Sequence, residues 1–400
     1  MTTFVGCGFA AKYLQGGGNF SVPLQWMLGL RRLKQDAIWL EHLPSEGNRR
    51  ADERKIDNFQ RQLRLHGLGG RYCLLYHENP QTVHDLDALR CVGISKRELL
   101  KRLSGPNTIL NLSYSIHPPL LLRFERRIFC DLDPSEIMFW MTKMELGQSF
   151  HHEFWTIGLN VNAADCRLPK NAVADVSPAA NDPRPTRPPL HPIEWKTFFP
   201  LVDTKLYRSK PRPKSPKFTT IGQWYWDGAV EVDGEYPDLS KKQAFEQYMG
   251  MPKRVPDAQF ELAMHMNPDD PERERVQSHG WRLAEPHTLA RTPQKYRQYV
   301  ASALGEFTAI KGVDVTWQTG WLSDRAAAFP ATGRPVITED SGAGKYLPSD
   351  SGFHFVGDLD QSVASVKDVM ANWPRRSREA RACAVEVFDS ARNLKKILAI

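Results

Sequence analysis

Short apolar runs alternate with amphipathic, helix-like stretches along most of this 400-residue chain. In the first half the runs at 36–43, 71–77 and 108–115 are separated by charged segments, and the pattern restarts at Phe218–Trp224. A strand followed by a helix and another strand is typical of a parallel sheet, because the chain must cross over the sheet before the next strand can begin. The alternation therefore predicts the α/β class, with doubly wound sheets.

The middle of the chain carries the signals of a domain boundary. Seven prolines fall within Leu168–Pro192, which predicts extended chain without a core of its own. The segment Lys205–Lys217 is basic, rich in proline and free of acidic residues. A length of 400 residues suggests two domains at roughly 100 to 200 residues each. We predict a first domain over 1–200, a basic Pro-rich linker over 201–217, a second domain over 218–375 and a C-terminal helix over 376–400.

Charge is spread unevenly over these parts. Residues 1–217 hold 31 Lys and Arg against 21 Asp and Glu, a net charge of +10, whereas residues 218–400 hold 22 against 25, a net charge of −3. A strongly positive half suggests a polyanionic partner. The alternative is that the cations only keep the protein in solution. The candidate contacts for a polyanion are the linker cations Arg208, Lys210, Arg212 and Lys214.

Several signals of other protein classes are missing from the sequence. No apolar run approaches the roughly 18 residues that span a bilayer, and no basic region precedes an apolar core at the amino terminus. The six cysteines are scattered and form no C-x-x-C pair, which predicts reduced thiols and neither a disulfide frame nor a zinc site. We therefore expect a cytoplasmic monomer that does not insert into membranes.

Glycines follow the first apolar run, Thr2–Val5. The sequence Gly6–Ala11 formally matches G-x-G-x-x-A, but a dinucleotide fold needs its helix to begin at the second glycine, and Gly16–Gly18 would break such a helix. We expect instead a long loop, then a helix from about Asn19 to Leu33. Backbone amides at Gly16–Gly18 and Asn19 would then suit the close approach of a diphosphate, although a plain flexible turn remains the alternative.

The most informative stretch is Gly320–Gly344. Ser323 and Asp324 offer a helix N-cap, and 325–332 continues as a short Ala-rich helix that ends at Gly333. A helix N-terminus of this kind attracts a phosphate. Ser323, Asp324 and Arg325 therefore form a candidate anion site.

A buried strand is predicted directly after that helix, at 335–338, and Glu339 and Asp340 follow it. Ligands of open α/β sheets bind outside the carboxyl ends of the strands, so this acidic pair is a candidate site for hydroxyl groups. An anion site beside a hydroxyl site suits a nucleoside-diphosphate sugar. The alternative is an ordinary helix–strand unit with a capped helix.

Two further acidic motifs admit a chemical and a structural interpretation. Asp131 and Asp133 form an Asp-x-Asp triplet that can bind a metal, but Pro134 after Asp133 and Glu136 favour a capped helix start. His152 beside Glu153 at the start of an expected strand is a candidate general base, or else an exposed pair.

The chain resembles the GT-B class of glycosyltransferases, in which two Rossmann-like domains face each other across a cleft. The resemblance rests on the glycine loop G-G-G-N-F-S, the linker opening onto F-T-T-I-G-Q-W, the sequence H-G-W-R-L, and the stretch G-W-L-S-D-R to A-T-G-R-P-V-I-T-E-D-S-G. It covers nearly the whole chain and is most specific in the second half. The pair of terminal helices also fits, because the last helix of this class commonly crosses back to the first domain.

The resemblance implies a role for several residues. The second domain would bind a nucleotide sugar such as a UDP-sugar, with Ser323, Asp324 and Arg325 near the diphosphate or ribose. Glu339 and Asp340 would lie near sugar hydroxyls. Trp281 and Arg282 would lie near the base. The class does not generally need a catalytic metal, and no other cofactor is implied.

One departure from the class concerns its glutamates. Glycogen-synthase-like retaining members carry one glutamate five residues before the glycine that corresponds to Gly333 and another eight residues earlier. Here those positions are Ala328 and Gly320. The stereochemical outcome therefore does not follow from the resemblance.

The first domain of this class binds the acceptor, and here that half is strongly basic. We therefore expect transfer to a hydroxymethylated base in double-stranded DNA, as in the phage DNA glucosyltransferases, with the base flipped out of the helix. A small-molecule or cell-envelope acceptor is the alternative. A third hypothesis is a non-catalytic nucleic-acid-binding protein on a glycosyltransferase fold.

Overall fold

The computed structural model describes residues 1–79, 85–169 and 193–399. The proline-rich segment predicted over Leu168–Pro192 lies almost wholly outside the described residues. The chain divides into two compact units. Unit 1 comprises 1–14, 19–158 and 168–198, and unit 2 comprises 15–18, 159–167 and 199–400.

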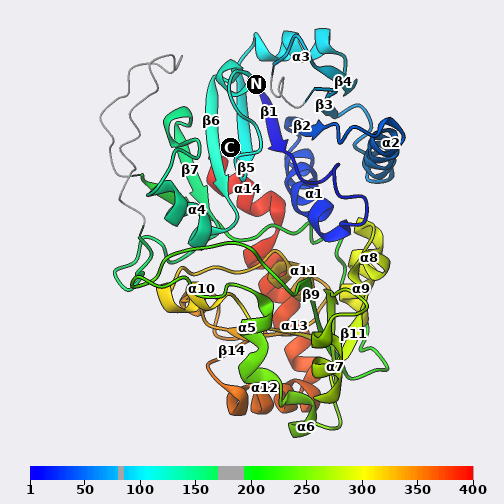
Figure 1. Ribbon diagram of the computed structural model, residues 1–400, viewed down its shortest axis with the longest axis vertical. Coiled ribbons are helices and arrows are strands. Elements are labelled where there is room, and N and C mark those ends of the chain that lie inside the picture. Colours follow the sequence, from blue (N-terminus) through cyan, green and yellow to red (C-terminus); the bar gives the residue numbers. More distant parts are fainter. Residues whose placement is uncertain (80–84, 170–192, 400) are drawn as a thin grey trace. The chain divides into compact units, whose positions relative to one another are not determined.

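Unit 1 is built on a mixed sheet in the order β4-β3-β2-β1-β5-β6-β7-β8 (Figure 1). Every pairing in it is parallel except that of β3 with β4. Its strands are β1 (Thr2–Cys7), β2 (Asp36–Pro44), β3 (Tyr72–His77), β4 (Arg90–Gly93), β5 (Asn107–Leu112), β6 (Arg126–Asp131), β7 (Glu153–Thr156) and β8 (Trp195–Thr197). Its helices are α1 (Gly17–Arg32), α2 (Arg49–Leu65), α3 (Lys96–Leu103) and α4 (Pro134–Met141), with short 3-10 turns at Leu120–Arg123 and Gln148–Phe150.

Unit 2 is built on a sheet in which all the strands are parallel, in the order β11-β10-β9-β12-β13-β14. Its strands are β9 (Lys217–Gln223), β10 (Gln259–His265), β11 (Arg282–Ala284), β12 (Gly305–Thr308), β13 (Val336–Glu339) and β14 (Phe353–Val356). The chain starts in the middle of the sheet, winds outward to β11, and then restarts on the other side of β9 at β12. This is the strand order of a Rossmann-type sheet, with its topological switch point between β9 and β12.

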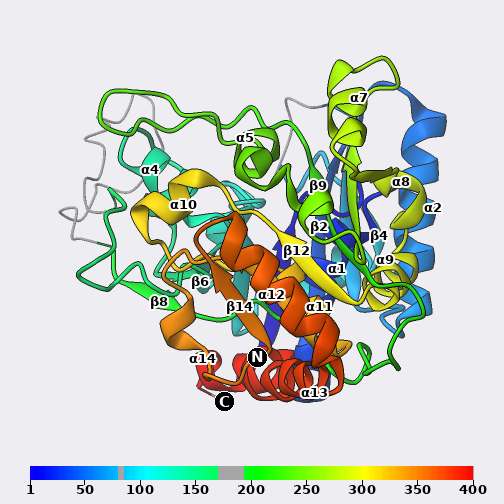
Figure 2. The same ribbon diagram turned by 90° about the horizontal axis from the view of Figure 1, so that it is seen from below.

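Helices cover both faces of this second sheet. The helices of unit 2 are α5 (Lys241–Phe245), α6 (Met251–Arg254), α7 (Pro271–Ser278), α8 (Pro286–Leu289), α9 (Pro293–Ser302), α10 (Gly312–Trp317), α11 (Arg325–Ala331), α12 (Leu359–Ala371), α13 (Trp373–Cys383) and α14 (Ser390–Leu398), with 3-10 turns at Glu246–Tyr248 and Gly344–Tyr346. In Figure 2, α12 lies along β14, and α11 packs between the strands and α13. Strands β12 and β13 are buried throughout, as expected for a parallel sheet covered on both faces.

The chain end is helical, as the sequence predicts. Pro374 stands in the first turn of α13, and a π-helical turn at Ala384–Phe388 separates α13 from α14. Helix α14 groups with unit 2. Its crossing to the first domain stays a prediction.

The start of the chain also follows the expectation. Helix α1 begins at Gly17, two residues before the predicted Asn19, and Gly8 stands in the loop that precedes it. No helix starts at the second glycine of the G-x-G-x-x-A match, so the helix start that a nicotinamide-binding loop needs is not formed there.

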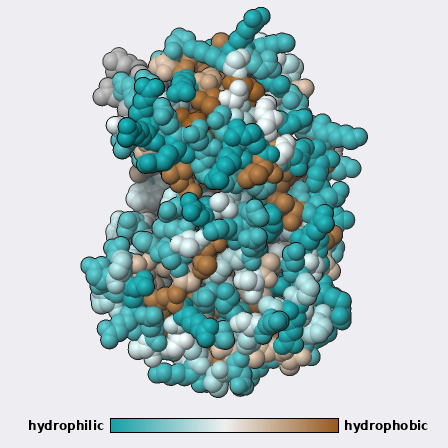
Figure 3. All heavy atoms as spheres, turned by 90° about the vertical axis from the view of Figure 1, so that its right-hand side faces the viewer, coloured by the Kyte–Doolittle hydropathy of each residue, from teal (hydrophilic) through white to brown (hydrophobic). Residues whose placement is uncertain are grey.

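The surface and the helices give two further findings. On the face drawn in Figure 3, hydrophilic residues dominate and hydrophobic ones form separate small groups. Within the residues that the structure describes, the helices are all too short or too polar to cross a membrane.

Candidate functional site

Four charged side chains gather at the switch point of the second sheet: Lys241, Glu306, Arg325 and Glu339. Glu306 stands on β12 and Glu339 ends β13, whereas Lys241 begins α5 and Arg325 begins α11. Parallel strands on either side of a switch point separate at their carboxyl ends, and the resulting crevice is where α/β sheets bind ligands. The cluster therefore lies where a ligand site is expected.

Glu306 and Arg325 form an ion pair inside the unit. Glu306 is fully buried, and its Oε1 lies 3.5 Å from Nε of Arg325 and 3.2 Å from the hydroxyl of Thr220 on β9. Burial raises the pKa of Glu306, and the Arg325 charge opposes that rise. Neither Oε2 of Glu306 nor Nε of Arg325 has a hydrogen-bond partner among the described residues. The pair is held by charge rather than by a full set of hydrogen bonds, and this favours a role in ligand binding.

The guanidinium of Arg325 lies against the end of β9. A Cβ atom built on Gly222 would be 4.0 Å from Nη1 of Arg325. The backbone at the switch point is thus covered by a cation.

Lys241 supplies a second cation to the same place. Its Nζ donates a hydrogen bond to the carbonyl of Ala309, directly after β12. Burial, followed by repulsion from Arg325, lowers the pKa of Lys241 to about 7, and attraction to Glu339 and Glu306 only partly opposes this. A lysine that titrates near pH 7 can gain a proton when an anion arrives.

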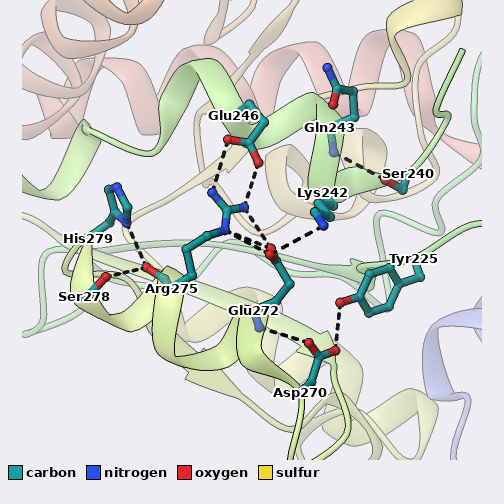
Figure 4. A network of polar contacts seen from close by, with 10 residues as sticks. All are labelled: Tyr225, Ser240, Lys242, Gln243, Glu246, Asp270, Glu272, Arg275, Ser278 and His279. Atoms are coloured by element: carbon teal, nitrogen blue, oxygen red, sulfur yellow. Dashed lines mark hydrogen bonds and ion pairs between the residues drawn. The ribbon is translucent and has the colours of Figure 1, made fainter.

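A polar network positions the helix that carries Lys241. Arg275 on α7 donates to both carboxylate oxygens of Glu246 at 3.2 and 2.7 Å and to Glu272 at 2.8 Å (Figure 4). Nζ of Lys242 lies 3.5 Å from Glu272. Since Ser240 caps α5 by accepting from the Gln243 amide, the start of this helix is fixed from two sides.

Glu339, a predicted sugar contact, holds the site together. Its Oε1 accepts from Nε2 of Gln247 at 2.7 Å and from the hydroxyl of Tyr248 at 3.1 Å, and its Oε2 accepts from the Ile310 amide at 2.8 Å. These bonds tie the end of β13 to the loop after β12. Burial raises the pKa of Glu339 although the Ile310 amide stabilises the charged form. Most of its acceptor capacity is used within the protein.

The other predicted residues of the Gly320–Gly344 stretch lie beside this cluster. Ser323 caps α11, because its hydroxyl accepts from the Ala326 amide at 3.3 Å, whereas Asp324 makes no side-chain cap bond. Burial raises the pKa of Asp324 to about 6. Asp340 is exposed and its Oδ1 accepts from the amides of Gly342 and Gly344, so it shapes the turn after β13.

The glycine at position 17 is required by the packing of the backbone around it. Gly16–Gly18 belongs to unit 2, and the Gly17 amide donates to the Ala290 carbonyl at 2.9 Å. A Cβ on Gly17 would stand 2.2 Å from that oxygen and 2.4 Å from the carbonyl of Thr292. This approach of two backbones explains Gly17 without a ligand, and binding of a diphosphate by Gly16–Gly18 and Asn19 stays a prediction.

Trp281 and Arg282 do not fit the predicted contact with a nucleobase. Trp281 is buried in the core, and its indole N–H donates to the Met249 carbonyl at 3.1 Å. Arg282 opens β11, at the amino-terminal edge of the sheet, and donates to Gln259 at 2.7 Å. Both lie at the start of the strand, away from the carboxyl edge that carries the charged cluster, so the structure argues against this assignment.

His152 and Glu153 likewise lie at the wrong edge of their sheet. The His152 amide donates to the carbonyl of Arg127 at the start of β6, and Glu153 opens β7. Glu153 binds Arg126 at 2.6 Å and Lys196 at 2.7 Å, and although burial raises its pKa, these bonds lower it to about 2. Burial and the nearby Arg127 charge lower the pKa of His152. The geometry supports the alternative of a surface ion-pair cluster rather than a catalytic base.

The first residue of the Asp-x-Asp triplet makes structural contacts within the protein. Asp131 is fully buried at the end of β6, where it accepts from the Thr156 hydroxyl at 2.6 Å and from the Asp133 amide at 2.8 Å. Asp133 stands at the N-cap of α4 with Pro134 behind it, as predicted, but its carboxylate makes no cap bond.

The loop after β1, at the switch point of unit 1, is held by a buried carboxylate. Oε1 of Glu41 accepts from the amides of Ala10 and Ala11 at 2.9 and 2.8 Å, and Oε2 accepts from the indole of Trp39. Burial raises the pKa of Glu41 to about 7. This residue belongs to none of the motifs predicted from the sequence.

The basic segment is anchored to unit 2. Arg334, almost fully buried, donates to the carbonyls of Lys210 at 2.8 Å and Pro211 at 2.9 Å, and also to Ala301 at 2.7 Å. Arg212 donates to the Met370 carbonyl at 3.2 Å. The backbone of the segment is therefore held in place by hydrogen bonds. Its candidate polyanion contacts are all exposed: Arg208, Lys210, Arg212 and Lys214.

Lys241 and Glu306 were not predicted from the sequence. No strand was expected at Gly305–Thr308, so the carboxylate on β12 was not considered. A four-residue strand directly after a helix gives little periodicity. Nothing in the sequence shows which strand end the helix start at Ser240–Lys241 reaches.

No protein-family model matches the sequence, and no curated protein sequence matches it. The structure resembles an α-glucosyltransferase solved with UDP and a 13-mer DNA containing an A:G mismatch, with a TM-score of 0.57 at 9% identity over 100% of this chain and 99% of that one. The fold is GT-B. A glycosyltransferase of Rickettsia africae ESF-5 gives 0.53 at 9% identity, covering 100% of this chain and 97% of that one. The E. coli structure described as "Trehalose-6-phosphate" bound with UDP-2-fluoro glucose gives 0.52 at 12%, covering 100% and 98%.

Within the GT-B fold, the predicted α/β class and the two Rossmann-like sheets are confirmed. The resemblance stated from sequence motifs is confirmed at the level of the fold. At 9 to 12% identity these likenesses establish architecture. The chemistry depends on the residues of this chain.

Proposed function

We propose that the protein is a glycosyltransferase that moves a sugar from a nucleoside-diphosphate donor to an acceptor hydroxyl. The observation that carries the proposal is the pair of cations, Lys241 and Arg325, at the switch point of the second sheet. The bound UDP in one GT-B neighbour and UDP-2-fluoro glucose in another support a uridine nucleotide as the donor.

The cations suit the chemistry of the departing group. In transfer, the bond between the sugar carbon and the diphosphate oxygen breaks, and the electron pair leaves with the diphosphate. The acceptor oxygen forms the new bond, and its proton passes to the departing diphosphate or to solvent. Lys241 and Arg325 would neutralise the charge that develops on the leaving oxygen, and preorganised charge of this kind commonly lowers the barrier more than any other effect in enzyme catalysis.

Glu306 and Glu339 have supporting parts in this scheme. Glu306 keeps the Arg325 guanidinium in place through the ion pair at 3.5 Å. Since Nε of Arg325 makes no hydrogen bond within the described residues, a phosphate oxygen could bind there without breaking one. Glu339 fixes the loop after β12 by accepting from the Ile310 amide. The Ala309 carbonyl of the same loop accepts a hydrogen bond from Nζ of Lys241. Ser323, Asp324 and Asp340 remain proposed contacts of the ribose, diphosphate or sugar.

A donor-hydrolysis and transfer assay tests the proposal. The protein is incubated with a panel of nucleotide sugars and release of the nucleoside diphosphate is measured by chromatography. We expect release from at least one donor, and loss of release in Lys241→Met and Arg325→Ala. Full activity in both variants would remove the charged cluster from the mechanism, and no release from any donor would favour the non-catalytic alternative.

For the acceptor we propose a hydroxymethylated base in duplex DNA. The net charge of +10 over residues 1–217 and the exposed cations Arg208, Lys210, Arg212 and Lys214 support a polyanion. One structural neighbour was solved with a DNA that contains an HMU base. A small-molecule or cell-envelope acceptor is the second candidate.

Two measurements separate these acceptors. Nucleoside mass analysis of hydroxymethylated DNA after incubation with the donor should show the mass of one added sugar. Duplex binding should weaken steeply with salt, since each neutralised phosphate adds about 0.9 to the logarithmic salt slope. Changing Lys210 and Lys214 to Gln should reduce that slope. No mass gain and a flat salt dependence would favour a small acceptor.

A further inference from the structure

Three side chains meet at the carboxyl ends of β10 and β11. His265 is the last residue of β10, Glu285 follows β11, and His287 lies in α8. Nδ1 of His265 is 3.1 Å from Oε2 of Glu285, and Nδ1 of His287 is 3.1 Å from Oε1. We propose that these residues bind a divalent transition-metal ion of the zinc type, with one coordination position left open.

The ligand set fits such an ion. Two imidazoles and one carboxylate are a common protein ligand set for zinc in sites that keep an exchangeable position. Four ligands at 2.0–2.1 Å in a tetrahedron lie about 3.3 Å from one another. The separation of 3.1 Å between Nδ1 of His265 and Oε2 of Glu285 is already close to that edge, and the ligand atoms of all three residues lie within 4.8 Å of one another. Small side-chain rotations would complete the site.

The backbone holds two of the ligands ready. Glu285 is the N-cap of α8, its Oε1 accepts from the His287 amide at 3.0 Å, and Pro286 between them occupies the first helical turn. The metal would take Oε2 of Glu285 in place of its present contact with Nδ1 of His265 at 3.1 Å. His265 is fixed by the pairing of β10 with β9, where it stands opposite Gln223.

The exposure of the ligands to solvent supports an open coordination position on the metal. The side chains of His265 and Glu285 are 47% and 43% exposed, so water or an anionic oxygen can complete the coordination. The three residues lie at the same edge of the sheet as Lys241 and Arg325, where ligands of such sheets bind. On binding, each imidazole offers an Nδ1 lone pair, and any proton on that nitrogen passes to solvent. The inference does not depend on the proposed glycosyl transfer.

The sequence alone led to the expectation of no metal site. His265 and Glu285 are 20 residues apart and belong to different strand ends, so no short motif joins them. Only the parallel pairing of β10 with β11 brings them together.

Metal binding by the full chain tests the inference. Chelator-treated protein is titrated with Co²⁺ while the visible d–d bands are recorded, and Zn²⁺ is then added as a competitor. We expect one equivalent of Co²⁺ to bind. His265→Ala or His287→Ala should weaken binding at least about 100-fold, because loss of a residue that only hydrogen-bonds to a metal ligand already costs about 10- to 100-fold in affinity. His279→Ala is the matched control: this histidine lies in the same unit and binds the Arg275 carbonyl at 2.8 Å.

Two results would overturn the site. One is wild-type affinity no tighter than that of the His265→Ala, His287→Ala double variant, with all proteins folded by far-UV circular dichroism. The other is an equal loss in His279→Ala. Thermal unfolding gives an independent reading, since Zn²⁺ should raise the melting temperature of the wild type and of His279→Ala only. Added imidazole should change the Co²⁺ spectrum, and an unchanged spectrum would contradict the open position.

Discussion

Nε of Arg325 lies 3.5 Å from Oε1 of Glu306, so a cation at the start of α11 is paired with a carboxylate that solvent does not reach. The two residues are 19 positions apart and come together only because β12 lies between β9 and β13. An anion bound beside Arg325 therefore meets a charge that the protein already holds in place.

Removing this cation should weaken donor binding. A hydrogen bond to a charged group contributes about 1.5–3 kcal/mol, so we expect Arg325→Ala to lower UDP affinity roughly 10- to 100-fold in isothermal titration calorimetry. Arg282→Ala is the matched control, since Arg282 stands on the same sheet at its opposite edge. Equal losses in the two variants would point to general charge rather than to the site.

The affinity for UDP should depend on the protonation of Lys241. Its pKa of about 7, lowered by burial and by Arg325, means that the free site is half charged near neutral pH. A diphosphate favours the charged form, so binding should take up protons near pH 7 and affinity should fall as the pH rises through that value. Calorimetry in buffers of different ionisation enthalpy measures the uptake. Lys241→Arg should abolish the uptake and keep most of the affinity; unchanged uptake would exclude Lys241 as its source.

Stability should fall with rising pH because of Glu41. This carboxyl has its pKa raised from 4.5 to about 7, so the folded state holds a proton that the unfolded state releases. The stabilisation is complete below pH 4.5 and is lost as the pH approaches 7, an effect of about 3 kcal/mol at 1.36 kcal/mol per pKa unit. Urea unfolding of the wild type and Glu41→Gln over this range measures it. Parallel stability curves would contradict the prediction.

Gly17→Ala should destabilise the protein strongly. The new Cβ would meet the backbone of Ala290 and Thr292 at 2.2–2.4 Å, and neither segment is a flexible side-chain end. Overpacking typically costs about 1–3 kcal/mol, and we expect the upper part of that range in thermal unfolding. Gly105→Ala, which meets no atom within 4 Å, is the control. A Gly17→Ala variant as stable as Gly105→Ala would show that the loop can move aside.

Turnover should survive the substitution His152→Ala. The sequence made His152 a candidate base, but it stands at the amino-terminal edge of β6 and β7, beside Arg127. We expect kcat within about twofold of the wild type, because a side chain outside the proposed site makes no contact with the reacting groups. A loss of kcat by a factor of 100 or more would restore His152 as the base.

The sequence predicted the architecture better than the site. Alternation of strands and helices, the loop before α1 and the helix–strand unit around Arg325 and Val336 all follow from local patterns. Glu306 and Lys241 were not predicted, because their roles depend on which strands pair. No short stretch of the sequence shows that pairing. The roles of His152 and Trp281 stay predictions, and for a related reason: the sequence shows that they flank strands, but not that they stand at the strand ends opposite the crevice.

The buried Arg334 has a consequence for any polyanion that meets the basic segment. By binding the carbonyls of Lys210 and Pro211, it holds the backbone between Arg208 and Lys214 at fixed spacing. A partner would find the backbone that carries this array of cations already ordered, and little backbone entropy would be lost on association. Recognition would then depend on whether the spacing of the partner's negative charges matches that array, so that two polyanions of equal charge density would be distinguished by their geometry.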